Sequence, residues 1–457
     1  MSDILQSINP YTGEVLATFP KLNEEAIDNA IDQSAKAFKE WSVTGIDQRC
    51  EVTKALAKLL TENKRSLAEM ITREMGKPIS ESLAEVDKCI LLVNYFAEQA
   101  PTILQPKKLP SDFDQSYLRY DPIGTIVAVM PWNFPLWQVI RFAVPTMLAG
   151  NAVMLKHASN VLGCGEFIQQ LFQAAGYPLG SFRHLLIDSS QVEQVIAHPQ
   201  VQGVTLTGSG NAGKAVAQLA GKYLKKCVLE LGGSDALTIT ETADLDTATD
   251  RAFRSRMMNS GQTCIAAKRF IVHASIEEQV IEKLKALNES WRIGDPMDEE
   301  TQMSVMSRTD LVDTVEEQLD KLIEQGAELV FGGNRKDNHF EPTLLRNITT
   351  DMLPFHDEIF GPVGVIVTYE TEAEMVELIN GVPFGLGSSF WTQDEAQAER
   401  VIPQIQAGAL AINEMVKSSP KMPFGGVKES GFGREMGAEG MLEFTNMKTV
   451  IINGFKK

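Results

Sequence analysis

Short apolar runs alternate with helical patterns from Thr125 to about residue 231, and this alternation constrains the fold more than any other feature of the sequence. Runs that are apolar throughout predict strands buried on both faces, and here they read TIVAVMP, NAVMLK, FRHLLI, VQGVTLTG and KKCVLEL. Segments between them, such as CGEFIQQLFQAAG and NAGKAVAQLAGKYL, have the apolar spacing of helices. We therefore predict a doubly wound α/β domain, in which ligands bind beyond the carboxyl ends of parallel strands. Each candidate site residue below is expected at such an end.

A second α/β pattern begins at about residue 232. KRFIVH predicts a strand and IEEQVIEKLKALNESW a helix, and further strands are expected at ELVFGG, PVGVIVTY, GLGSSFW and ALAIN. At 457 residues the chain is longer than one hydrophobic core usually supports, so at least two domains are expected. Residues 24–100 predict a scaffold of amphipathic helices. The segments SYLRYDPIG and KTVIING predict two half-exposed strands that pair into a small sheet between subunits.

Composition excludes several classes of function. The formal net charge of -18 argues against nucleic-acid binding, which needs a basic patch to neutralise phosphates. The 5 cysteines are scattered without a CxxC pair and the 6 histidines are isolated, so neither a disulfide framework nor a metal site is expected. No signal peptide is evident, and the longest apolar stretch, 142–155, is shorter than the roughly 20 residues that cross a bilayer. We expect a cytoplasmic protein with neither a membrane nor a nucleic-acid partner.

The segment GSGNAGKA, which starts at Gly208, satisfies two phosphate-binding patterns. As GxGxxG between a strand and a helix it is typical of a dinucleotide fingerprint, with Glu230 near the position of a ribose-binding acid. As GxxxxGK it approaches a P-loop, but Ala215 stands where the hydroxyl ligand of magnesium is needed, which disfavours nucleotide hydrolysis. In either case backbone amides at a helix N-terminus suit a phosphate. A tight glycine-rich turn without a ligand is the third alternative.

Three side chains are candidates for catalysis. Cys264, in NSGQTCIAAKRF, has small neighbours that let a substrate approach, and a helix ending nearby would favour the reactive thiolate; a small buried hydrophobe is the alternative. Glu230, in LELGGSD, is either a general base or an ordinary solvated or salt-bridged carboxylate. Asn133, in MPWNFP, either donates to an oxyanion or forms an Asx turn before Pro135.

The order and spacing of the motifs resemble the aldehyde dehydrogenase superfamily over about residues 8–450. The matching strings are PWNFP (131–135), NAVMLKHAS (151–159), TGS (207–209), LELGGSD (229–235), GQTC (261–264), EIFGP (358–362) and PFGGVKESGFGRE (423–435). The resemblance implies an aldehyde dehydrogenase-like α/β fold with a Rossmann-type doubly wound cofactor domain, a second α/β catalytic domain and a small β oligomerisation element. The implied boundaries are 1–105 and 123–231 for the dinucleotide-binding domain, 232–436 for the catalytic domain, and 106–122 and 437–457 for the oligomerisation segments of a homodimer or homotetramer.

The resemblance also implies a role for each catalytic candidate. Cys264 is expected to attack the aldehyde carbon, and Asn133 is expected to stabilise the oxyanion together with the backbone amide of Cys264. Glu230 then activates the water that hydrolyses the thioester, and it is no longer expected to bind ribose. A relative that transfers the acyl group to CoA is disfavoured because hydrolysis needs this base. An inactive structural homologue is disfavoured because the catalytic residues are all retained.

A nicotinamide dinucleotide is the cofactor that the resemblance implies. Lys156 is expected at the adenosine ribose, Ser209 at the pyrophosphate, and Glu358 with Phe360 at the nicotinamide ribose. Further cofactor contacts are expected from Trp132, Ser159, Gly208 and Leu231. Gly210 stands where the family often has threonine or glutamate, so the geometry of this turn stays open.

Cofactor preference is expected to depend on Ser159. Family members that prefer NAD often carry a glutamate three residues after the lysine equivalent to Lys156, and its carboxylate repels a 2′-phosphate. Serine removes this repulsion and offers a donor, so NADP is the expected preference, with NAD possible. Alternatively Ser159 fills space and both cofactors work.

Arg141 is the main indication of the substrate. It matches an arginine that succinate-semialdehyde dehydrogenases use for the substrate carboxylate, and its planar fork of donors suits that task. Ser419, in NEMVKSSP, is expected near the pocket mouth, whereas Met258 stands where some of those enzymes have a second arginine. A short aldehyde with a distal carboxylate, such as succinate semialdehyde, is expected. The alternatives are a structural ion pair for Arg141 and a broad-specificity or other semialdehyde dehydrogenase.

Overall fold

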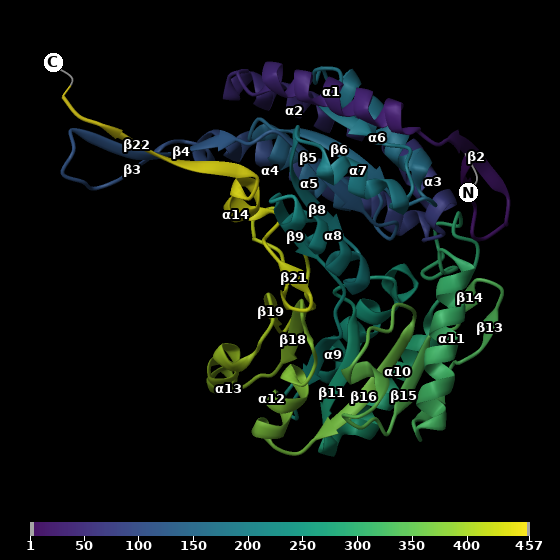
Figure 1. The fold of residues 1–457 in the computed structure, drawn as a ribbon. Helices are drawn as coiled ribbons and strands as arrows, with labels where there is room; N and C mark the ends of the chain where they lie inside the picture. Colours follow the sequence, from purple (N-terminus) through teal and green to yellow (C-terminus); the bar gives the residue numbers. More distant parts are fainter. Residues whose placement is uncertain (1–3, 455–457) are drawn as a thin grey trace.

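The computed structural model describes residues 4–454, which form two large sheets and a small sheet that projects from them as an arm (Figure 1). The first large sheet has the order β21-β9-β8-β5-β6-β7, and its strands are parallel except for β21. Their bounds are β5 (Thr125–Met130), β6 (Ala152–His157), β7 (Phe182–His184), β8 (Val201–Thr207), β9 (Lys226–Glu230) and β21 (Gly431–Phe432). The strands predicted before residue 231 are therefore confirmed. The edge strand β21 comes from much later in the chain.

Alternate residues of the first sheet pack against helices on opposite faces, as expected for strands without a solvent face. In β5, Ile126 and Ala128 face one core while Val127 faces the other. One face carries α1 (Glu24–Trp41), α7 (Val192–Ala197) and α8 (Gly210–Lys222). The other carries α2 (Ile46–Glu62), α3 (Lys64–Met75), α4 (Ile79–Ile103), α5 (Trp137–Leu148) and α6 (Leu162–Ala174). The predicted doubly wound domain and its helical scaffold are confirmed.

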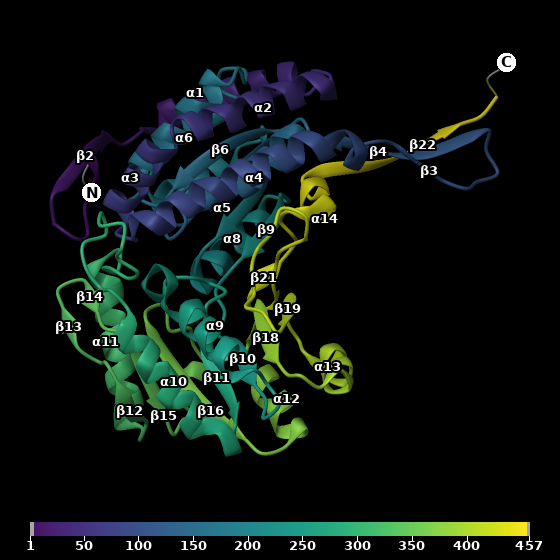
Figure 2. The same ribbon diagram turned by 180° about the vertical axis from the view of Figure 1, so that it is seen from behind.

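The second large sheet has the order β12-β15-β16-β11-β10-β18-β19 and is parallel except for the edge pair β12 and β15. Its strands are β10 (Asp235–Ile239), β11 (Ala267–His273), β12 (Glu328–Phe331), β15 (Thr343–Arg346), β16 (Val363–Tyr369), β18 (Gly387–Trp391) and β19 (Ala409–Ile412). One face packs on α9 (Leu245–Met257) and α10 (Glu277–Ser290), and the other on α11 (Thr309–Glu324), α12 (Glu372–Asn380) and α13 (Glu395–Val401). Figure 2 shows this second layer below the first.

The arm is a three-stranded sheet in the order β22-β4-β3. It consists of β3 (Lys107–Lys108), β4 (Gln115–Pro122) and β22 (Thr445–Ile452), and the short helix α14 (Gly437–Leu442) precedes β22. The predicted pairing of the two distant strands is confirmed, because Thr445 lies opposite Pro122 and the antiparallel register continues to Ile452 opposite Gln115. Three small two-stranded antiparallel sheets complete the described fold: β1 (Ile4–Ile8) with β2 (Val15–Pro20), β13 (Arg335–Lys336) with β14 (His339–Phe340), and β17 (Phe384–Gly385) with β20 (Val427–Lys428).

Candidate active site

The site lies where the first sheet reverses its strand order. The chain winds from β5 outward through β6 to β7 and then returns to β8 on the other side of β5, so the ends of β5 and β8 form a topological switch point. Asn133 follows β5, Gly208 and Ser209 follow β8, and Glu230 ends β9. Because β8 pairs in parallel with both β5 and β9, these residues meet at one edge of the sheet.

A cavity of about 220 Å³ opens at this edge. Most of the residues predicted for cofactor binding and catalysis line it: Trp132, Asn133, Gly208, Ser209, Glu230, Leu231, Cys264, Glu358 and Phe360. The Trp132 and Phe360 rings meet edge to face, with their centroids 5.8 Å apart. Leu311 of α11 also lines the cavity, and nothing in the sequence had marked it. We call this space the cofactor-side cavity.

A second cavity, of about 180 Å³, lies on the other side of Cys264. Its wall consists of faces of α4 and α5 together with Cys264, Met258, Ser418 and Phe424. Cys264 lines both cavities and is only partly buried, so the residue borders each space. We call the second space the aldehyde-side cavity, after the substrate that the sequence predicts. The predicted thiol therefore sits between two cavities and is not enclosed in a packed core.

The segment before Cys264 has an unusual backbone. Asn259, Ser260 and Gly261 all have positive φ, at 57°, 53° and 73°. A side chain at Gly261 would place its Cβ 2.2 Å from the carbonyl oxygen of Gly361, so glycine is required there. Cys264 itself precedes the amino end of β11 in the second sheet. The expectation that every site residue follows the carboxyl end of a strand was wrong for the nucleophile. Cys264 lies just before the amino end of β11, because the second sheet turns the amino ends of its strands toward the site.

The thiol of Cys264 is held in its protonated form. Burial raises its pKa to about 11, although the charges of Arg141 and Lys268 act in the opposite direction. The expected stabilisation of the thiolate by a nearby helix end is not what this environment provides. The segment Met258–Gly261 just before Cys264 has left-handed backbone at Asn259 and Ser260, so it is not a regular helix whose end could stabilise an anion.

Asn133 is fixed by hydrogen bonds on both sides of its amide. Its Nδ2 donates to the carbonyl oxygen of Gln262 at 2.9 Å, and its Oδ1 accepts from Nε2 of Gln138 at 3.1 Å. Gln262 is two residues from Cys264, so the amide is tied to the nucleophile segment. Because a primary amide carries two N–H groups, one of them stays available for an oxygen in the cavity.

Glu230 is a buried carboxyl group beside a second one, Glu435. Neither oxygen of Glu230 has a hydrogen-bond partner among the described residues. Burial raises its pKa well above the usual 4.5, the charge of Glu435 raises it further, and Arg141 and Arg434 oppose the shift. A raised pKa makes the carboxylate a stronger base.

Arg141 lies in the aldehyde-side cavity, as expected, but its guanidinium already has a partner. Its Nε is 2.5 Å from Oε2 of Glu435, and both side chains are buried. Ser418 lines the cavity, whereas Ser419, the serine expected near the pocket mouth, does not. Lys88 also lines the cavity and was missed, because its helix looked like scaffold.

Glu358 is held by Lys268 in the cofactor-side cavity. The Lys268 ammonium lies 2.9 Å from Oε1 of Glu358 and donates to the carbonyl oxygens of Thr263, at 3.0 Å, and Cys264. Gly232 lets the carboxylate approach, since a Cβ there would lie 2.1 Å from Oε2 of Glu358. Lys268 therefore connects the predicted ribose contact to the nucleophile segment, a link that sequence reasoning did not identify.

Lys156 and Ser159 also lie where the parallel strands of the first sheet end, but they belong to β6 and to the turn after it. Lys156 pairs with Val129 across β5 and β6, and burial lowers the pKa of its ammonium. Ser159 is exposed in the turn after β6. Ser209 caps α8, because its side chain accepts from the amide of Ala212 at 3.4 Å. Ser209 lines the cavity, and the amides that follow it at the start of the helix suit a phosphate.

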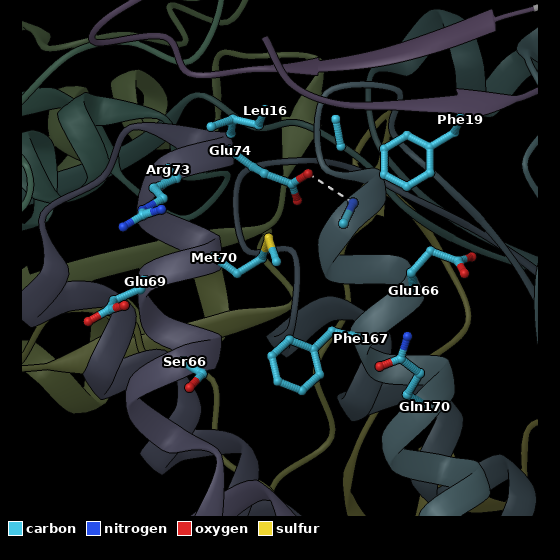
Figure 3. A pocket seen from close by; sticks show the side chains of 12 residues that line it. Leu16, Phe19, Ser66, Glu69, Met70, Arg73, Glu74, Glu166, Phe167 and Gln170 are labelled. Carbon is cyan, nitrogen blue, oxygen red and sulfur yellow. Dashed lines mark hydrogen bonds between the residues drawn. The ribbon is translucent and has the colours of Figure 1, made fainter. Parts of the chain in front are cut away.

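A larger cavity, of about 610 Å³, lies away from this site between β2, α3 and α6 (Figure 3). Glu74 points from α3 toward the first turn of α6, where its carboxylate accepts from the amides of Gly163 and Cys164 at 2.8 Å each. None of the predicted site residues lines this space.

No group of three or more His, Cys, Asp or Glu side chains in residues 4–454 is arranged to hold a metal ion. Within the same residues, no helix is long and apolar enough to cross a membrane.

Comparisons with known proteins cover nearly the whole chain. Residues 2–450 match the sequence model of the aldehyde dehydrogenase family. The succinate semialdehyde dehydrogenase Sad of Escherichia coli (strain K12), named as NAD(P)+-dependent, is 43% identical over 447 residues, which cover 97% of each chain. The NADP+ succinate-semialdehyde dehydrogenase of Deinococcus radiodurans is 40% identical over 97% of this chain and 94% of its own. The crystal structure of a succinic semialdehyde dehydrogenase from Streptococcus pyogenes, in complex with NADP+, has a TM-score of 0.96 at 36% identity, covering 98% of this chain and 100% of that one.

Proposed function

The chain belongs to the aldehyde dehydrogenase family, and we propose that it oxidises succinate semialdehyde, or a similar short aldehyde with a distal carboxylate, to the carboxylic acid. The observation that carries the proposal is the position of Cys264 between two cavities. One cavity has the features of a nicotinamide dinucleotide site, and the other combines apolar walls with the cations Lys88 and Arg141. Relatives at 40–43% identity carry succinate-semialdehyde dehydrogenase as their name, which supports the same substrate class.

The residues of the cofactor-side cavity fit a nicotinamide dinucleotide. The start of α8 offers backbone amides to a pyrophosphate, Glu358 offers a carboxylate to ribose hydroxyls, and Trp132 and Phe360 offer ring surfaces. Such a cofactor, when bound, supplies the acceptor for the hydride that leaves the substrate carbon.

The chain's own residues supply the rest of the chemistry. The Cys264 thiol releases its proton to solvent, and its sulfur forms a bond to the aldehyde carbon as the carbonyl π bond opens. The resulting oxygen anion accepts hydrogen bonds from Asn133 and the backbone amide of Cys264. Oxidation of this adduct leaves a thioester on Cys264. Glu230 then takes a proton from water, whose oxygen attacks the thioester carbon and releases the acid and the thiol.

NADP is the proposed preferred cofactor, with NAD accepted. Ser159 is exposed at the end of β6 near Lys156, and a serine there places no negative charge against a 2′-phosphate. The S. pyogenes structure contains NADP+, and the E. coli relative is named for both cofactors.

A spectrophotometric assay tests this function. The purified protein is mixed with NADP+ and succinate semialdehyde, with and without CoA, and reduced cofactor is followed by absorbance. We expect turnover without CoA and succinate as the product. Strict dependence on CoA would indicate acyl transfer, and no reduction with any aldehyde would contradict the proposal.

Assembly and location are proposed on separate grounds. The arm projects from the body with β22 at its open edge, and exposed apolar side chains such as Met447 and Ile451 lie along that strand, which favours a homodimer or homotetramer (Figure 1). All five cysteines are free, as in proteins of a reducing compartment, so we propose the cytoplasm. Size-exclusion chromatography with light scattering tests the first point, and imaging of a fluorescent fusion tests the second.

A further inference from the structure

The aldehyde-side cavity contains four charged side chains, Glu81, Glu85, Lys88 and Arg141, and three of them are already satisfied. Glu85 pairs with the buried Lys77 at 2.6 Å, and Arg141 pairs with Glu435 at 2.5 Å. Both oxygens of Glu81 accept from the amide of Asn259, at 3.2 and 3.0 Å. Burial raises the pKa of Glu81 to about 7, so its negative charge is partial at neutral pH.

Lys88 differs from these three because no carboxylate pairs with it in residues 4–454. It lies on α4 one helical turn beyond Glu85, on the helix face that also presents Glu81 to the cavity. Its ammonium donates to the neutral hydroxyl of Ser418 at 2.6 Å and lies 4.2 Å from the centroid of the Trp137 ring. Burial, with the nearby charge of Arg141, lowers the pKa of this ammonium to about 8.

A half-buried cation without a counter-ion is costly unless a ligand brings the opposite charge. The remaining walls of the cavity are mainly apolar and include Phe134, Trp137, Met258 and Phe424. Such a space fits a short hydrocarbon chain with one anionic end. Met258 adds no charge to this wall, and Arg141 is paired with Glu435, so Lys88 is the lining cation without a carboxylate partner among the described residues.

We propose that Lys88 binds the distal carboxylate of the substrate, that Ser418 holds its ammonium toward the cavity, and that Arg141 serves mainly as the partner of Glu435. This assignment rests on the proposed aldehyde oxidation and names the specificity-determining residue of the same site. It also assigns the role expected of Ser419 to the adjacent Ser418.

The test compares two aldehydes of equal length, succinate semialdehyde and butanal, which differ in the distal carboxylate. Lys88→Met removes the charge while keeping a long side chain, Lys88→Arg keeps the charge, and Lys58→Met, at an exposed lysine of α2, is the matched control. We expect Lys88→Met to lower the ratio of kcat/KM for succinate semialdehyde over butanal by about 10- to 100-fold, the usual effect of losing a charge-assisted hydrogen bond. Most of the change should appear in KM, Lys88→Arg should recover part of it, and Lys58→Met should leave the ratio unchanged.

One outcome would overturn the inference. An unchanged ratio in Lys88→Met, whether both aldehydes keep their kcat/KM or lose it equally, would show that Lys88 does not select the carboxylate. If Lys88→Met does not fold, Lys88→Gln, which still donates to Ser418, takes its place.

A binding measurement separates this inference from the proposed function. Titration calorimetry with succinate should give binding to the wild-type protein that weakens about 10-fold or more in the Lys88 variant. If neither aldehyde is oxidised but succinate still binds through Lys88, only the proposed reaction fails. If the wild type oxidises succinate semialdehyde and succinate binds both proteins equally, only the role of Lys88 fails.

Discussion

The two cavities that meet at Cys264 are built in different ways. The cofactor-side cavity is made largely of loops that follow strands, and its glycines, Asn133 and Glu230 sit where a parallel sheet ends. Half of the residues that line the aldehyde-side cavity lie on faces of α4 and α5, and the other half come from segments outside these helices. The shape of the cofactor-side cavity therefore depends on backbone geometry, whereas the chemistry of the aldehyde-side cavity depends on which side chains α4 and α5 present. A change in substrate can therefore be made on a helix face without disturbing the sheet that holds the cofactor.

The largest effect is expected at the residue shared by both cavities. Cys264→Ala should lower kcat on the order of 10⁴-fold or more, because it removes the one thiol among the residues that line the two cavities. Cofactor affinity, measured by fluorescence titration, should change less than about twofold because the cofactor-side wall keeps its other residues. Cys227→Ala, at the other partly exposed cysteine, is the control. Appreciable turnover by Cys264→Ala would remove the thiol from its proposed role.

A substitution at Glu230, on the cofactor side, should separate hydride transfer from the hydrolysis of the thioester. Glu230→Gln should lower steady-state turnover by about 10²- to 10⁴-fold, because water loses its base, while hydride transfer still occurs once. Rapid-mixing absorbance should show a burst of about one equivalent of reduced cofactor per active site. Glu429→Gln, at an exposed glutamate, should behave as the wild type. Loss of the burst would mean that Glu230 acts before the thioester forms.

The pH dependence of thiol alkylation tests the electrostatics at the boundary between the cavities. Burial raises the pKa of Cys264 to about 11, so below that pH the thiolate fraction is small and grows as pH rises. The rate of reaction with iodoacetamide in the cofactor-free protein should rise about tenfold per unit between pH 7 and pH 9. Mass spectrometry of the modified peptide assigns the rate to Cys264. A rate that is already level at pH 7 would indicate a stabilised thiolate instead.

The smallest effect is expected at the outer end of the cofactor side. Ser159→Glu should lower the NADP/NAD ratio of kcat/KM by about tenfold, because its carboxylate repels the 2′-phosphate. Ser159→Ala removes the hydroxyl without adding charge and should change the ratio less. Steady-state constants with both cofactors measure this. An unchanged ratio in Ser159→Glu would place the selectivity in other residues.

The sequence predicts the sheets and the cofactor side better than the aldehyde side. Buried strands and glycine turns leave local patterns, so Gly208, Glu230 and Asn133 are recognisable from their neighbours in the chain. The charge of Lys88 leaves no such pattern, because lysines are common on the outer faces of amphipathic helices. Likewise, the partner of Arg141 lies nearly three hundred positions away at Glu435, and no periodicity indicates which distant residue will meet it. The raised pKa of Cys264 also follows from burial rather than from its sequence neighbours.

The chain returns to the first sheet at β21, and this return affects whether the first half of the protein can be produced alone. A fragment that stops after residue 231 would lack β21, which covers the outer edge of β9, and also Glu435, which neutralises Arg141. An uncovered strand edge promotes aggregation, and a buried guanidinium without its partner costs several kcal/mol, about 3–5. Producing the first half alone should therefore give insoluble material, whereas a nick in an exposed loop of the intact chain should leave both halves bound to each other.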